Sequence, residues 1–266
     1  GRLGHLEPQL VARLLEGGRN LPGQVPGGIA AMTENMHGLA GAHPCWNNPH
    51  YRLFLQSILE ETFANHPVDG INYGSERYGP LSDLLIWGRT PECFCEHCMR
   101  KAGDRGVDGA RAREGFGELR TLLRRIRAGD RLRDGAYIVF LSTLLKYPEL
   151  LSWEQLAHEW REDFNRLLYG TVKRIKPTAE FGVHVDHQKT TWDPLSRAEI
   201  DYEEMTGYND FIKPVVYHDV AGPRIRHYSV DPLHETIFSQ IPKEQQLEWH
   251  YRIMGFDPER EPAYEE

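Results

Sequence analysis

Three of the four cysteines lie within six residues, in Cys93-Phe94-Cys95-Glu96-His97-Cys98, and the fourth, Cys45, lies far upstream. Four thiolates complete one tetrahedral zinc site, and the Cys-x-Cys-x2-Cys spacing places three sulfurs on one tight turn. The sequence therefore predicts a metal site that ties two remote segments together. Because a closed four-sulfur site leaves no position for water or substrate, we expect the zinc to be structural and not catalytic.

Two alternatives use the same residues differently. A disulfide pair plus two free thiols is disfavoured, because bridges between such close cysteines are strained and the chain is not a small stapled scaffold. His43 or His97 can replace a sulfur as a ligand, although we expect both to be bystanders. A zinc-binding thiol cluster favours the cytoplasm over an oxidising compartment.

Length and composition indicate one large globular domain. The chain has 266 residues, of which 40% are hydrophobic, and it carries 31 basic and 39 acidic residues. The resulting net charge of −8 gives no support for a nucleic-acid partner. The sequence contains no apolar run of about 18 residues, so we expect no membrane partner. A homo-oligomer is compatible with this composition.

Strand-like and helix-like segments alternate along the chain. Asn48 and Pro49 have the residue types of an N-cap and a first helical position, so a helix is expected at 49–64. A second helix is predicted where Trp153, Leu156 and Trp160 recur at helical spacing. Further helices are expected at 195–206 and 243–254, and buried strands at 68–73, 181–185 and 210–218.

Strands separated by helices predict parallel pairing and the α/β class. We expect a TIM-type (β/α) barrel that is incomplete in this chain, because only three of its eight strands are recognisable. Residues 1–266 are expected to form this one barrel domain or a portion of it, with a helical insertion at about 99–150. Pro214 predicts a local break in the ladder of the third strand.

The order of these motifs resembles a known family. His43-Pro44-Cys45-Trp46-Asn47-Asn48-Pro49-His50-Tyr51-Arg52 followed by the cysteine knuckle is similar to the zinc-binding segments of family 42 β-galactosidases. Asn72-Tyr73-Gly74-Ser75-Glu76-Arg77-Tyr78-Gly79-Pro80-Leu81 resembles the Trp-Gly-Ser-Glu-Arg-x-Gly-Pro-Leu segment of uncharacterised glycosyl-hydrolase-like barrel proteins. The resemblance implies a barrel with a zinc site beside its active face and a carbohydrate substrate.

Glu76 is the catalytic candidate. Family 42 enzymes have Asn-Glu-Tyr-Gly at this point, with the Glu as acid/base, and this chain departs from that pattern. A carboxyl group at the C-terminal end of a barrel strand faces the catalytic mouth, and glycosidic cleavage needs one protonated and one ionised carboxyl. Arg77, if paired with Glu76, favours a nucleophile over an acid. Alternatively, the pair is a structural salt bridge.

The partner carboxylate is not identifiable from the sequence; the resemblance places the nucleophile on a seventh strand, which we expect beyond residue 266. The chain is therefore expected to be a retaining glycoside hydrolase or, alternatively, a non-catalytic carbohydrate-binding or assembly barrel. Polar residues near strand ends are the candidates for substrate binding: Asn72, Arg77, His184, Asp186, His187, Lys213, Tyr217 and His218. A second metal site formed by Asp186, His187, His218 and Asp219 is a weaker alternative, because its spacing matches no sharp motif.

Overall fold

The computed structural model describes residues 31–74, 77, 79–215 and 221–264. Their strands form two separate sheets. β1 (Met32–Glu34) and β2 (Ala40–Pro44) pair antiparallel. β3 (Gly70–Gly74), β4 (Glu180–Val185) and β5 (Phe211–Pro214) form a parallel sheet in the order β3-β4-β5.

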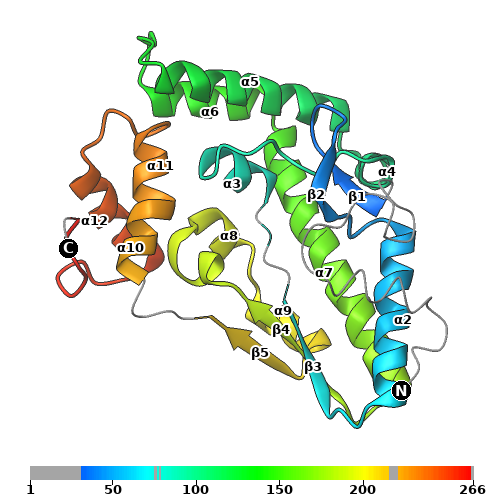
Figure 1. The fold of residues 1–266 in the computed structure, drawn as a ribbon. Helices are drawn as coiled ribbons and strands as arrows, with labels where there is room; N and C mark the ends of the chain where they lie inside the picture. Colours follow the sequence, from blue (N-terminus) through cyan, green and yellow to red (C-terminus); the bar gives the residue numbers. More distant parts are fainter. Residues whose placement is uncertain (1–30, 75–76, 78, 216–220, 265–266) are drawn as a thin grey trace.

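The parallel pairing of the three expected strands is confirmed, but the expected barrel is wrong. Within the described parts of the chain the parallel sheet has only three strands, and β3 and β5 are its open edges. Among the described residues, helices and no strand of this sheet separate β3 from β4, and short helices follow β5. No further described strand pairs with either edge, so this sheet is open. The structure is an open α/β arrangement with a small antiparallel hairpin (Figure 1).

The helices between β3 and β4 build most of the core. They are α3 (Pro80–Leu85), α4 (Glu96–Asp104), α5 (Gly109–Arg127), α6 (Ala136–Lys146) and α7 (Glu149–Ile175). α7 runs beside α2 (Pro49–Asn65), as Figure 1 shows. The predicted stripe on α7 is buried, with Trp153 at 0% and Trp160 at 7% exposure. This helix therefore connects the cysteine-rich region to the sheet.

The start of α2 follows the sequence prediction. The Asn48 side chain accepts hydrogen bonds from the amides of His50 at 2.9 Å and Tyr51 at 3.3 Å. These bonds satisfy two of the amides that a helix start leaves without partners, and Pro49 occupies the first position, where no amide is needed. This cap fixes the direction in which the chain leaves Cys45.

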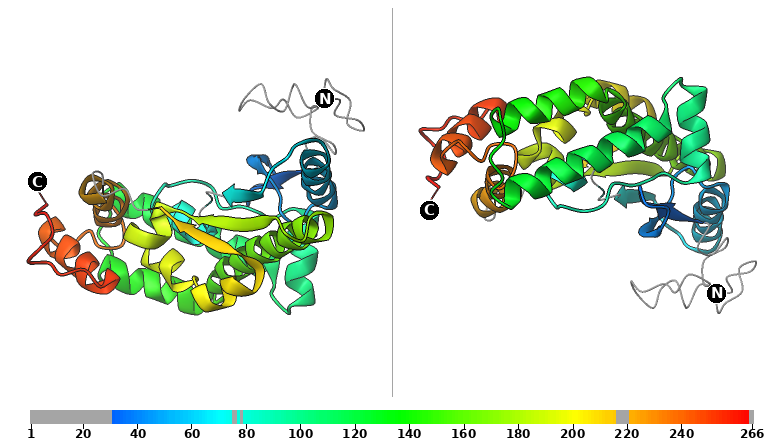
Figure 2. Two further views of the ribbon diagram at one scale, coloured as in Figure 1. Left: turned by 90° about the horizontal axis from the view of Figure 1, so that it is seen from below. Right: turned by 90° about the horizontal axis from the view of Figure 1, so that it is seen from above.

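The C-terminal third consists of short helices, not the single helix expected at 195–206. The segments are η2 (Gln188–Trp192), α8 (Pro194–Ala198), α9 (Tyr202–Met205), η3 (Thr206–Tyr208), α10 (Ala221–Ile225), η5 (Arg226–Val230) and α11 (Asp231–His234). α12 (Lys243–Met254) has the bounds that the sequence predicts. Figure 2 shows α10, α11 and α12 at one end of the molecule and the β1–β2 hairpin at the other. None of the helices among the described residues has the length and apolarity needed to cross a bilayer.

Candidate metal centre and the pocket beside it

Two segments that are far apart in the sequence bring the cysteines together. Cys45 follows β2, and its amide donates to the Ala31 carbonyl at 2.8 Å. In the knuckle, the Phe94 amide donates to the Glu34 carbonyl at 2.7 Å, so the turn is attached to β1. Cys95 is the N-cap of α4, and Cys98 lies in the first turn of that helix. The hairpin and α4 thus hold the two halves of the cluster.

The four sulfurs converge as the sequence predicts. All four Sγ atoms lie within 4.8 Å of one another, and Cys45 Sγ is 3.6 Å from Cys95 Sγ and 3.5 Å from Cys98 Sγ. Four ligands at 2.3 Å from one tetrahedral ion are about 3.8 Å apart, so these separations suit a single ion. All four cysteines are free, and the disulfide alternative is therefore wrong.

Hydrogen bonds from the surrounding chain support negative charge on the sulfurs. The Asn47 amide donates to Cys45 Sγ at 3.4 Å, and Asn47 Nδ2 donates to Cys98 Sγ at 3.3 Å. The Glu34 amide donates to Cys93 Sγ at 3.3 Å. Donors around metal-binding thiolates orient the ligands and offset their charge. Asn47, one residue from the cap of α2, is a supporting residue that the sequence analysis did not identify.

Without a bound cation the thiols of the cluster differ in their pKa values. Hydrogen bonds from Cys45 and the other two thiols hold the pKa of Cys95 far below its usual range. Hydrogen bonds with Cys45 and then Cys95 raise the pKa of Cys93, although Cys98 opposes that shift, and hydrogen bonds with Cys45 and the other two thiols raise the pKa of Cys98. A bound cation removes this competition, because it stabilises all four sulfurs as thiolates. Among the described residues the only metal-ligand group is this set of four cysteines, so neither His43 nor His97 belongs to it.

A pocket of about 80 Å³ adjoins the cysteine cluster. Its wall contains Cys45, Cys93 and Cys98 on one side and the indoles of Trp46 and Trp160 elsewhere. Its charged and titratable members are His43, Arg77, Asp83, Arg89 and Glu92. Of the predicted substrate-binding residues that the structure describes, Arg77 alone lines this pocket.

Arg77 is held in the pocket wall by its own neighbours. Its Nη1 donates to the Pro44 carbonyl at 2.6 Å, and the guanidinium carbon lies 4.4 Å from the centroid of the Trp46 ring. Burial lowers the pKa of Arg77, while the nearby Tyr51, Tyr73 and Cys45 oppose that shift. The guanidinium remains charged at any physiological pH.

Two carboxyl groups share the pocket with Arg77. Burial raises the pKa of Asp83 to about 7, and the negative field of Glu92 adds to this shift, although Arg89 lies 3.5 Å from Asp83 and opposes it. Glu92 accepts a hydrogen bond of 2.5 Å from Thr33 Oγ1. A carboxyl that is half protonated near neutral pH is suited to proton transfer. Neither residue was identified from the sequence. The one available signal was for Glu92, which directly precedes Cys93.

α3 carries Asp83 into this position and is anchored on both sides. Glu154 Oε2 on α7 accepts the Leu81 amide at 2.7 Å, and burial raises the pKa of the fully enclosed Glu154 well above its usual value. Ser82 Oγ donates to Asp193 Oδ2 at 2.6 Å. These two bonds fix the first turn of α3 against α7 and α8.

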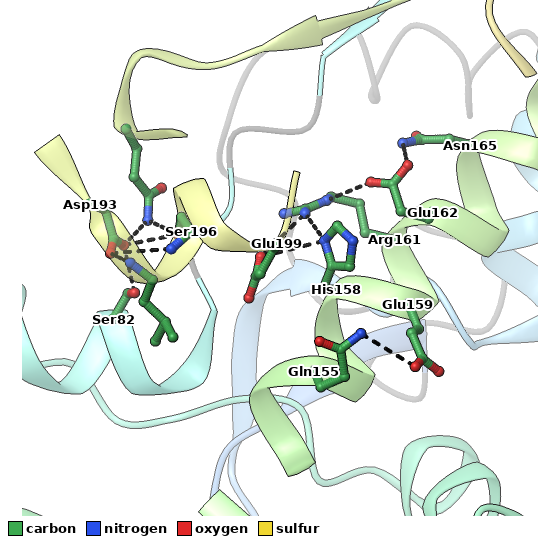
Figure 3. A network of polar contacts seen from close by, with 12 residues as sticks. Ser82, Gln155, His158, Glu159, Arg161, Glu162, Asn165, Asp193, Ser196 and Glu199 are labelled. Carbon is green, nitrogen blue, oxygen red and sulfur yellow. Dashed lines mark hydrogen bonds and ion pairs between the residues drawn. The ribbon is translucent and has the colours of Figure 1, made fainter. Parts of the chain in front are cut away.

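A network of buried charges lies behind α3 (Figure 3). Arg161 on α7 is 3.2 Å from Glu162 and 3.6 Å from Glu199, and His158 Nδ1 is 3.4 Å from Glu199. Such paired and hydrogen-bonded groups connect α7 to the segment after α8. We interpret the network as structural, because the positive charge of Arg161 is balanced by the carboxylates of Glu162 and Glu199.

Comparison of this chain with models of known protein families found no match, and comparison with curated protein sequences found none either. The assignment of a function therefore depends on the site itself.

The structure places three of the predicted substrate-binding residues on one face of the sheet, apart from the pocket that Arg77 lines. Gly74, His184 and Lys213 are paired across the sheet, so His184 and Lys213 project from the same face. Asn72 belongs to that face too, and both it and Lys213 are exposed. Ile71 and Tyr73 alternate to the opposite face, which packs against α7. Asn72, His184 and Lys213 are not among the residues that line the Arg77 pocket.

Asp186 and His187 follow β4 but face different surroundings. Asp186 Oδ1 accepts the Gln188 amide at 2.8 Å, and burial raises the pKa of Asp186. The His187 ring lies 4.6 Å from the Trp192 ring, and burial, followed by the field of Arg224, lowers the pKa of His187 to about 4. The catalytic candidate Glu76, the binding candidates Tyr217 and His218, and Asp219 of the second predicted metal site lie outside the described residues.

Proposed function

We propose that the ion held by the four cysteines is zinc and that its role is structural. The proposal is supported by an all-sulfur ligand set with four members, which suits tetrahedral Zn²⁺ and leaves no open coordination position. The short sulfur–sulfur separations favour one ion over a multinuclear iron–sulfur cluster, whose cysteine ligands bind separate irons. The zinc would fix the hairpin and α4, and with them one wall of the pocket.

We further propose that the chain is a carbohydrate-active hydrolase that cleaves O-glycosyl bonds with retention at this pocket. The observation that carries the proposal is Asp83, a carboxyl whose pKa is about 7, in a pocket that also contains two indoles and Arg77, the residue next to Glu76 in the chain. Glycoside hydrolysis requires one protonated and one ionised carboxyl group. Indole rings, such as that of Trp160, provide flat apolar faces for sugar rings.

The roles can be divided between two carboxyl groups. Asp83 would protonate the leaving oxygen, since it holds its proton up to about pH 7. Glu76 would attack the anomeric carbon as a carboxylate, because the neighbouring Arg77 in the chain favours the ionised form. A non-catalytic carbohydrate-binding protein with a structural zinc is the second candidate. It is favoured by the contacts of Arg77 with the Pro44 carbonyl and the Trp46 ring, which suit a residue that only holds its loop in place.

Hydrolysis of aryl glycosides distinguishes these two functions. We expect the zinc-loaded protein to hydrolyse at least one member of a panel of nitrophenyl α- and β-glycosides. Glu76→Gln and Asp83→Asn should each reduce kcat by about 10²- to 10⁴-fold, because each removes one acid–base or nucleophilic group and keeps the shape. Glycosides with highly activated leaving groups should restore turnover in Asp83→Asn alone.

Asp163→Asn is the matched control, since Asp163 pairs with Arg52 on the surface and does not line the pocket. It should keep the wild-type rate. Zinc content and circular dichroism should be unchanged in all three variants. If the rate survives in Glu76→Gln and Asp83→Asn, neither residue is catalytic; if sugars bind but no glycoside is cleaved, the binding function is correct.

The raised pKa of Asp83 also predicts how stability depends on pH. The folded state holds this proton up to about pH 7, while an unfolded Asp loses it near pH 3.8, so the contribution of Asp83 to stability falls between these values. Asp83→Asn should therefore stabilise the protein relative to wild type more at pH 8 than at pH 4. Urea unfolding at both pH values measures this difference, which we expect to be on the order of 1–4 kcal/mol. An equal effect at pH 4 and pH 8 would contradict the raised pKa.

A further inference from the structure

The guanidinium of Arg77 has an unusual set of partners. Its described hydrogen bond goes to the neutral carbonyl of Pro44, and its flat face rests on Trp46. No carboxylate among the described residues lies within ion-pair distance of it, although every other arginine that lines this pocket or the adjacent charged network has one. Partly buried arginines normally pair with an anion, since isolated charge is costly away from water.

Other cations face the same space. His43 and Arg89 line the pocket together with Arg77. Arg89 is engaged with Asp83 at 3.5 Å and stacks at 5.1 Å on Trp87. Arg77 is therefore the arginine of this pocket whose guanidinium forms no ion pair with a carboxylate among the described residues.

We infer that the pocket binds a sugar that carries a carboxylate, a uronic acid, and that Arg77 holds this carboxylate. The inference rests on the proposed hydrolase and names its substrate class. The planar guanidinium fork matches a carboxylate through two parallel hydrogen bonds, and the Trp46 ring and the Pro44 carbonyl fix the plane of that fork.

The neighbouring charges favour a carboxylate over a phosphate. Asp83 and Glu92 line the same pocket, and a dianionic phosphate would be repelled by them more strongly than a monoanion. A neutral sugar would leave the guanidinium without an anion, so the neutral counterpart of the substrate should bind less tightly.

Binding of four small glycosides to the full-length, zinc-loaded chain tests this inference. Calorimetry should be done with methyl glucuronide and methyl glucoside, and with methyl galacturonide and methyl galactoside. We expect one uronide to bind about 10- to 100-fold more tightly than its neutral counterpart, the range of a charge-assisted bidentate contact. Arg77→Met should abolish this preference and leave the affinity for the neutral glycoside unchanged, and Arg77→Lys should restore part of it.

Arg52→Lys is the matched control, because Arg52 is another partly buried arginine that rests on an aromatic ring, with its guanidinium carbon 5.8 Å from the Phe164 centroid, and it is paired with Asp163. The uronide preference should survive in it. A preference that is absent from the wild-type protein, or unchanged in Arg77→Met, would overturn the inference. Loss of zinc in Arg77→Met would also overturn it, since Arg77 would then serve to balance the charge of the cysteine cluster. Binding of glucose 6-sulfate as tight as that of the uronide would overturn it too.

Failure of the hydrolase proposal gives a different pattern. Uronide binding that depends on Arg77, without cleavage of any glycoside, supports the uronate site and removes the hydrolytic activity. Cleavage of neutral glycosides with no uronide preference supports the hydrolase and overturns the uronate site.

Discussion

The Cys98→Ser variant should be purified without the one equivalent of zinc that we expect in the wild-type protein. Serine supplies neither a soft ligand nor a group that ionises at neutral pH, so the tetrahedral set is left incomplete. The hairpin and α4 would then lose their common anchor. We expect the melting temperature to fall by roughly 10 °C, which corresponds to a few kcal/mol for a domain of this size.

Elemental analysis and thermal unfolding measure this effect, and treatment of the wild-type protein with a strong chelator should reproduce it. His97→Gln is the matched control, because His97 lies within the knuckle but is not part of the four-sulfur group. It should keep its zinc. Iron in place of zinc in the purified protein would correct the identity of the metal, and a metal-free wild-type protein with unchanged stability after chelation would refute the centre.

Trp153→Ala should cost about 3–5 kcal/mol of unfolding free energy, the range for large cavities in a well-packed core. Trp153 is fully buried and stacks on Phe94 of the knuckle, with ring centroids 4.7 Å apart, and it meets Trp160 edge-to-face at 5.7 Å. Its removal therefore opens a cavity beneath the cysteine cluster. The variant should also hold zinc less tightly, because the Phe94 turn loses its support.

Denaturant unfolding and competition with a zinc indicator test both parts. Trp249→Ala provides the control, since Trp249 on α12 is 44% exposed and its truncation should cost no more than about 1 kcal/mol. Equal losses in the two variants would show that Trp153 does not have this central role.

The metal centre could be predicted from the sequence because residue type and short spacing are enough to recognise its ligands. Three cysteines on one turn need only one more sulfur, and the chain contains only one other cysteine. The cap at Asn48 and the apolar stripe of α7 are local patterns too, and both were read correctly. By contrast, the hairpin of β1 and β2 was missed, since its strands are short and one of them is full of glycine and alanine.

The three parallel strands were predicted correctly, but the barrel inferred from them is wrong. Alternation of strands and helices predicts parallel pairing but does not determine how many strands join the sheet. Of the expected strand at 210–218, β5 covers Phe211–Pro214, and residues 216–218 lie outside the described part of the chain. Proline is tolerated there because β5 is an edge strand.

The pocket beside the metal centre could not be found from sequence patterns. Asp83 and Glu92 are ordinary surface residue types, and they become unusual only because α3 is fixed against α7 through Glu154. Of the described candidates, Asn72, His184 and Lys213 share one face of the sheet, whereas Arg77 lines the pocket. Glu76 and His218 lie outside the described residues, so the expected common face of Glu76, His184 and His218 stays a prediction. His184 and Lys213 project from one face of an open sheet, and no closed barrel turns them toward a common centre.

The pairing of β3 with β4 has a consequence for synthesis of the chain. Gly70 pairs with Glu180, a residue 110 positions later, whereas Cys45 and Cys98 are only 53 positions apart. At about 5–20 residues per second, β3 waits roughly 5–20 s for its partner after it leaves the ribosome. Cys98 follows Gly70 by only 28 positions, about a quarter of the distance to Glu180, so the nascent chain can complete the cysteine cluster and bind its metal while β3 is still an unpaired strand. Zinc supply during translation would then decide whether the hairpin and α4 are already held together before β3 meets its partner.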